Sequence, residues 1–168
     1  MKKELDGNIS GRMCIVIMES NSLSNNELIT GISILAVLRY SKIMEISKCM
    51  LIEPLMSYHK VTQLLERKNS SIKSIEDLII KESITFSTFN DRYMERFVLT
   101  INAIMLFSKM GLLEIKDNLV VFQGEGFDFN NQTLGQKAKR RITASYNLSK
   151  ILDKGETSDL YLSLRIHI

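Results

Sequence analysis

The hydrophobic pattern is strongest in the second half of the chain. From about residue 88 to 110, apolar residues recur on nearly every side of a predicted helix, and Gly111 follows it. A glycine commonly supplies the left-handed residue that ends a helix. Because a helix that is apolar nearly all round is normally enclosed by its neighbours, we expect this helix to lie inside the core. Two apolar runs around the pair Asp117-Asn118 then predict a β-hairpin over about residues 112–122.

A second long helix is predicted over about residues 132–153. Its polar side carries the basic residues Lys137, Lys139, Arg140 and Arg141, and apolar residues form the opposite side. Helix, two-stranded wing and helix, in this order, is the layout of a winged-helix module. The pattern therefore predicts a mainly α (α+β) fold: a helical domain with a winged-helix-like module and a short β-hairpin.

The first half of the chain predicts further helices. Apolar residues at roughly 3.6-residue spacing indicate a helix from about residue 24 to 42. The apolar run 46–58 contains the only proline, Pro54, and we expect two short helical pieces to meet there. A helix through residues 61–65 follows. Ser74 then precedes acidic residues in the way that a helix N-cap does, which predicts a short helix after it.

Composition fits one compact domain. A chain of 168 residues with 45% hydrophobic and 24% charged residues is long and apolar enough to bury a core. Residues 1–22 are polar and glycine-dotted apart from the apolar stretch 14–18, and are predicted to be a flexible or extended segment. Residues 23–168 are then predicted to form a single helical, winged-helix-like domain.

Charge, cysteine content and hydropathy suggest a cytoplasmic protein. Cys14 and Cys49 both lie in apolar runs, so we interpret them as small buried hydrophobes in a reducing compartment. No stretch reaches the roughly 18 apolar residues that a membrane span requires, so we expect no membrane association. The net charge of +3 is too small to indicate nucleic-acid binding by itself, although a local basic face could still bind DNA.

Residues suited to catalysis or metal binding are few. His59 and His167 have no further ligands at helical or hairpin spacing, and no glycine-rich phosphate-binding motif is present. We therefore expect no metal, no cofactor and no enzyme activity. Glu53 and Glu114 are the carboxylates inside apolar runs. A buried carboxylate can act as a catalytic acid, but more often such a residue faces outward or pairs with a base.

The basic segment has two interpretations. In a winged helix, a cationic helix near the wing can follow the phosphate backbone of DNA, and each phosphate contact adds salt-dependent affinity. The alternative is an ordinary solvated helix face. On the first interpretation, the candidate DNA or phosphate contacts are Lys137, Lys139, Arg140 and Arg141.

Two segments resemble a known family. The apolar stretch 50–60 around Pro54 and the C-terminal Gly-x-Thr-x-Asp-Leu-Tyr stretch 155–161 are similar to the middle component of three-component ABC systems. This component is the small subunit of Lamassu-type anti-phage and anti-plasmid defence, and the likeness covers about residues 23–168. The resemblance implies a non-catalytic adaptor that bridges an SMC-like ABC ATPase, which senses foreign DNA, and a nuclease effector. DNA is then reached through the complex.

An adaptor needs an exposed surface for its partners. Nine methionines suggest an adaptable surface, and those beside Pro54 are better interface candidates than those in predicted core helices. Together with the C-terminal stretch, this gives the candidate partner interface Met50, Pro54, Met56, Thr157, Asp159, Tyr161 and Arg165. The alternative function is a stand-alone winged-helix regulator that binds DNA directly.

Overall fold

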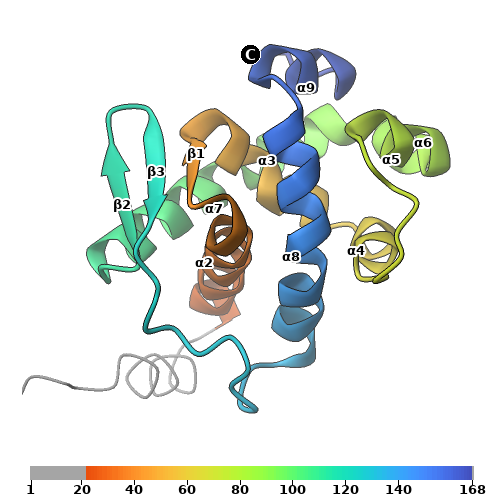
Figure 1. Cartoon of the computed structure of the whole chain (residues 1–168). Coiled ribbons are helices and arrows are strands. Elements are labelled where there is room, and N and C mark those ends of the chain that lie inside the picture. The colour runs from red at the N-terminus through yellow and green to blue at the C-terminus, as the bar shows by residue number, and fades with distance from the viewer. Residues whose placement is uncertain (1–21, 168) are drawn as a thin grey trace, which may run out of the picture.

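The computed structural model describes residues 22–167, with side chains from residue 27 onward (Figure 1). The predicted N-terminal segment 1–22, including its apolar stretch, therefore lies outside the described residues apart from Ser22. Eight helices and three strands follow one another in the described part, which confirms the predicted mainly α (α+β) fold. The helices are α2 (Ser22–Ser41), α3 (Ile46–Met56), α4 (His59–Leu65), α5 (Ile75–Lys81), α6 (Ser83–Phe86), α7 (Phe89–Lys109), α8 (Gln136–Lys154) and α9 (Thr157–Ser163).

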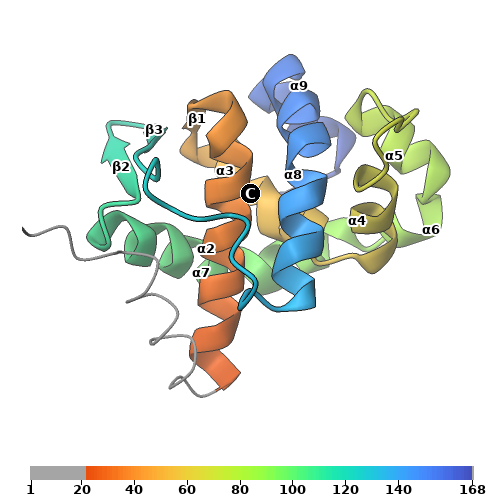
Figure 2. The ribbon, with the colours of Figure 1, turned by 60° about the horizontal axis from the view of Figure 1, so that its bottom comes forward.

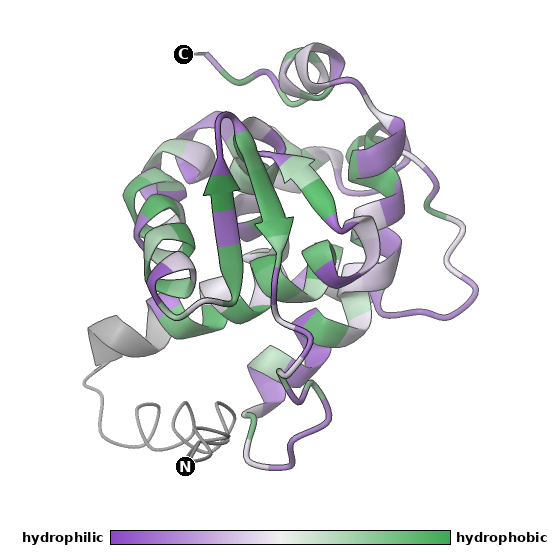
Figure 3. Cartoon of the chain, turned by 60° about the vertical axis from the view of Figure 1, so that its left-hand side comes forward, coloured by the Kyte–Doolittle hydropathy of each residue, from purple (hydrophilic) through white to green (hydrophobic). Residues whose placement is uncertain are grey.

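A small antiparallel sheet completes the winged-helix layout. Strands β2 (Leu113–Lys116) and β3 (Leu119–Phe122) form the predicted hairpin, with Asp117 at φ +55° in its turn. A third strand, β1 (Ile43–Glu45), pairs with the other edge of β3, so the order is β1-β3-β2. Figure 3 shows β3, apolar along its length, between its two neighbours. The order α2, β1, α3, α7, β2, β3 is that of a winged helix, with α4 to α6 inserted before α7.

The core is built around α2. Apart from residue 29, all side chains from 28 to 38 are buried, and α2 packs beside α8 while crossing α7 (Figure 2). The crossing depends on Gly31, because a Cβ atom there would lie 2.0 Å from Cε2 of Phe107. Phe107 is itself fully buried. Glycine at this position therefore lets the two helices approach each other closely.

Several predicted boundaries are confirmed and others are wrong. Ser74 caps α5 by accepting a hydrogen bond from the Asp77 amide at 3.3 Å, and Gly111 ends the α7 region at φ +72°. In contrast, α3 is one helix with Pro54 in its last turn, and not two pieces that meet at the proline. Helix α8 begins four residues later than expected. None of the described helices is both long enough and apolar enough to cross a bilayer.

Candidate functional site

Helix α7 carries an exposed apolar face. The prediction that this helix is enclosed is wrong on one side, although its other side, with Tyr93, Ile104 and Phe107, is buried. Residues spaced by three or four positions lie on one side of a helix, and five such apolar side chains here remain 38–65% exposed. This α7 face consists of Met94, Phe97, Val98, Ile101 and Met105.

Polar residues border the α7 face along one side. Asp91 and Glu95 are exposed there, and Asn102 donates a hydrogen bond to the Glu27 carboxylate of α2 at 3.1 Å. In a DNA-binding winged helix, the helix at this position, directly before the hairpin, enters the major groove. The apolar α7 face offers phosphate no hydrogen-bond donors and leaves five large apolar side chains in water. Such a surface suits contact with another protein.

The four residues of the predicted basic segment do not form one DNA-binding face. Arg141 is buried, and its guanidinium donates to both oxygens of Glu53, at 2.5 Å and 3.3 Å. The interpretation of Arg141 as a DNA or phosphate contact is therefore wrong, because its charge is used inside the core. Glu53 pairs with a base, which is one of the two arrangements that the sequence favoured. Thr30 and Ser33 of α2 add hydroxyl contacts to this ion pair.

Two more of these basic residues are held by partners of their own. The Arg140 guanidinium pairs with Glu66 at 2.6 Å, which raises the pKa of Arg140, and donates to Nε2 of His59 at 2.6 Å. The Lys139 ammonium donates to the main-chain oxygen of Gln132 at 3.1 Å. Among the described residues, neither side chain is left without a partner.

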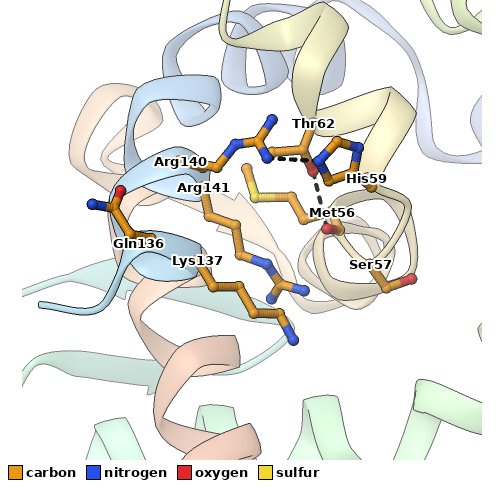
Figure 4. A pocket seen from close by; sticks show the side chains of 8 residues that line it. All are labelled: Met56, Ser57, His59, Thr62, Gln136, Lys137, Arg140 and Arg141. Carbon is orange, nitrogen blue, oxygen red and sulfur yellow. Dashed lines mark hydrogen bonds between the residues drawn. The ribbon is translucent and has the colours of Figure 1, made fainter.

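Lys137 differs from the other three basic residues. It has no hydrogen bond or ion pair with any described residue, and it lines a pocket between the end of α3, α4 and α8 (Figure 4). Arg140, Arg141 and His59 line the same pocket. The structure thus brings three of the four predicted basic residues to one pocket, and it leaves only Lys137 unpaired there.

Most of the predicted partner interface is placed differently from what the sequence suggested. Met50, Pro54 and Met56 are buried inside the domain, so the interpretation of these residues as an exposed partner surface is wrong. Helix α3, which carries all three, packs mainly against α7 and α2. The α7 face was not predicted, because a helix that is apolar nearly all round was expected to be covered on all sides. The signal that could have revealed this face is the presence of apolar residues on both sides of the helix.

The C-terminal candidates divide into two groups. Tyr161 donates to the Ser47 main-chain oxygen at 2.8 Å and lies 3.1 Å from the Tyr93 hydroxyl, and burial raises its pKa. Thr157 donates to the Glu45 carboxylate. These two residues attach α9 to the domain. Asp159 and Arg165 are exposed, and their contact with a partner stays a prediction.

The described residues offer little for metal binding or thiol chemistry. No three of their His, Cys, Asp or Glu side chains lie close enough together to hold a metal ion. Burial raises the pKa of the Cys49 thiol, as expected for a core cysteine, whereas Cys14 lies outside the described residues. Glu114 is exposed on the hairpin and accepts a hydrogen bond from Gln123 at 2.9 Å.

Comparison with other proteins identifies no relative. No protein-family model, curated protein or solved structure matches this chain.

Proposed function

We propose that this protein is a non-catalytic adaptor subunit that binds another protein through the α7 face. The observation that carries the proposal is the apolar surface on the helix that precedes the wing, where a DNA-binding winged helix carries polar and basic residues. Five large apolar side chains on one helix face lose contact with water when a partner covers them, and this is the main driving force for association.

The resemblance of the sequence to a known family supports a specific assembly. As the small subunit of a Lamassu-type defence system, the chain would join a cytoplasmic complex with an SMC-like ABC ATPase and a nuclease effector. The α7 face then binds the ATPase, and DNA is engaged by the complex as a whole. The paired or buried state of Lys139, Arg140 and Arg141 supports such an indirect role in DNA binding.

A bridging subunit also needs a second surface. Exposed apolar residues lie on the neighbouring helices α5, α6 and α9: Ile80, Ile84 and Leu162 are 76%, 88% and 75% exposed. Asp159 and Arg165 are exposed on or next to α9. We assign the second partner, the nuclease effector, to this end of the domain.

Co-expression tests the proposed function. Produced alone, the chain is expected to self-associate or precipitate, because the α7 face is uncovered. Produced together with an SMC-like ATPase encoded beside it, the chain is expected to stay in solution and to elute with the ATPase at a fixed ratio. A well-behaved monomer that does not bind the ATPase would contradict the proposal.

The alternative function, a stand-alone DNA-binding regulator, makes a different prediction. It requires binding of the chain alone to bare duplex DNA, with loss of binding when Lys137, Lys139 and Arg140 are replaced by alanine. Fluorescence anisotropy with a labelled duplex at two salt concentrations measures this directly, because phosphate contacts weaken steeply with salt. We expect no specific binding in this assay.

A further inference from the structure

A pocket of about 300 Å³ lies between the first turns of α8 and the junction of α3 and α4. Figure 4 shows Lys137 and Arg141 extending side by side from α8 toward the end of α3, while Arg140 meets His59 at the other side of the pocket. The α8 side of the pocket therefore consists of three basic residues and Gln136. The facing side consists of Met56, Ser57, His59 and Thr62.

Positive charge exceeds negative charge around this pocket. Glu66 pairs with Arg140 and Glu53 pairs with Arg141, so two of the cations are balanced by carboxylates. Lys137 has no such partner among the described residues. Lys137 lines the pocket, and its side chain extends beside that of Arg141 (Figure 4).

A fourth cation increases this imbalance. Arg96 of α7 interacts electrostatically with Lys137, and its Nε atom is buried without a hydrogen-bond partner in the described structure. Although Lys137 as a residue is exposed, its ammonium group reaches inward. Burial is the largest cause that lowers the pKa of Lys137; the charge of Arg141 lowers it further, Glu53 acts in the opposite direction, and Arg96 adds a smaller lowering. A bound anion would remove this unfavourable concentration of positive charge.

We propose that this pocket binds the phosphate group of a small molecule such as a nucleotide. The Lys137 ammonium donates to the phosphate oxygens, and the positive end of the α8 dipole adds to the attraction because the pocket includes the first two residues of that helix. A volume of about 300 Å³ is at the lower end of the range for small-molecule sites. Met56, together with Thr62, whose hydroxyl is bonded to main-chain oxygens, lines the space for the remainder of such a ligand.

Duplex DNA fits the same features less well. Binding along a duplex uses several exposed cations that each contact a backbone phosphate. Here Lys139 is bound to the Gln132 oxygen and Arg140 to Glu66, so the basic segment offers one unpaired cation inside a pocket. This arrangement favours a single phosphate group that enters the pocket. The proposal does not depend on the α7 face.

A matched pair of substitutions tests the proposal. The probes are inorganic phosphate, adenosine monophosphate and a short DNA duplex, each titrated by calorimetry into the full chain. All samples carry Val98→Glu, a substitution on α7 outside the pocket that is expected to lower self-association. Lys137→Gln is expected to weaken binding of adenosine monophosphate about tenfold or more, the scale of one lost charged hydrogen bond. Lys139→Gln, two residues further along α8 and outside the pocket, is expected to leave binding unchanged.

The possible results distinguish the phosphate group of a small molecule from a backbone phosphate of DNA. Binding of phosphate or adenosine monophosphate that depends on Lys137 and not on Lys139 supports the proposal. Binding of the duplex alone, weakened equally by both substitutions, would overturn it in favour of a surface contact with DNA. Absence of saturable binding by both small probes at millimolar concentration would also overturn it. Unfolding curves of each variant establish that the fold is retained.

Discussion

Arg141 of α8 and Glu53 of α3 form a two-hydrogen-bond ion pair in the core, with both side chains only 3% exposed. Thr30 of α2 donates to Glu53 and Ser33 of α2 accepts from Arg141, so the pair joins three helices at one point. A buried ion pair is tolerated only when its remaining donors and acceptors are satisfied in this way. We infer that the pair fixes how α8 is positioned against α2 and α3, and therefore the pocket that α8 lines.

Replacement of Arg141 by alanine is expected to destabilise the fold by about 3–5 kcal/mol, because Glu53 would remain buried without its counter-ion. The double variant Glu53→Met, Arg141→Met should lose less stability than the single variant, because no unpaired charge remains. Urea unfolding followed by circular dichroism measures both values. Lys139→Ala, a control at a nearby half-buried position outside the core, is expected to change stability by no more than about 0.5 kcal/mol. A similarly small effect of Arg141→Ala would contradict the assigned role of the pair.

Alanine at Gly31 should destabilise the domain although alanine is the better helix former. Its Cβ atom would meet the ring of Phe107, so α2 and α7 would have to move apart. Overpacking of this kind typically costs about 1–3 kcal/mol. Phe107→Leu removes ring atoms at the contact, and the double variant should therefore lose less stability than the sum of the two single variants. Thermal unfolding of the wild type, the two single variants and the double variant measures how far the two effects depart from additivity. Strict additivity would argue against the close contact.

The attachment of α9 should weaken in acid. Hydrogen bonds from Thr157 and then Ser47 hold the pKa of Glu45 below its usual value of 4.5. Since the folded-state pKa is lowered, the stabilisation is present above about pH 4.5 and is lost as pH falls through the lowered value. Thr157→Val removes the larger of these hydrogen bonds. The difference in unfolding free energy between the wild type and this variant should be constant above about pH 6 and should shrink toward about pH 3.

Local signals in the sequence were sufficient to predict several elements. The Ser74 cap, the Gly111 terminus and the Asp117 turn depend on short-range backbone preferences, and all three are confirmed. Strand β1 could not be predicted in the same way, because its three residues are defined by pairing with a strand more than 70 residues away. The position of Pro54 within its helix could not be predicted either, because proline is compatible both with a helix end and with a kink.

The direction of individual side chains was harder to predict than the helices themselves. Arg140 and Arg141 are adjacent in sequence and line the same pocket, yet the side chain of the first is 36% exposed and that of the second only 3%. Met56 points inward, whereas Val98 points outward from a helix that is apolar on most sides. In each case the neighbouring helices decide which side is covered, and those neighbours come from distant parts of the chain.

The most direct test of the central claim is the amount of SMC-like ATPase that co-purifies with Val98→Glu. Val98 is 65% exposed in the middle of the α7 face, so a charge there should leave the fold intact and make burial against a partner unfavourable. Ile43→Glu, on β1 and 52% exposed, is the matched control. We expect the first variant to lose the ATPase by about tenfold or more and the second to retain it. Equal retention by both variants would contradict the account.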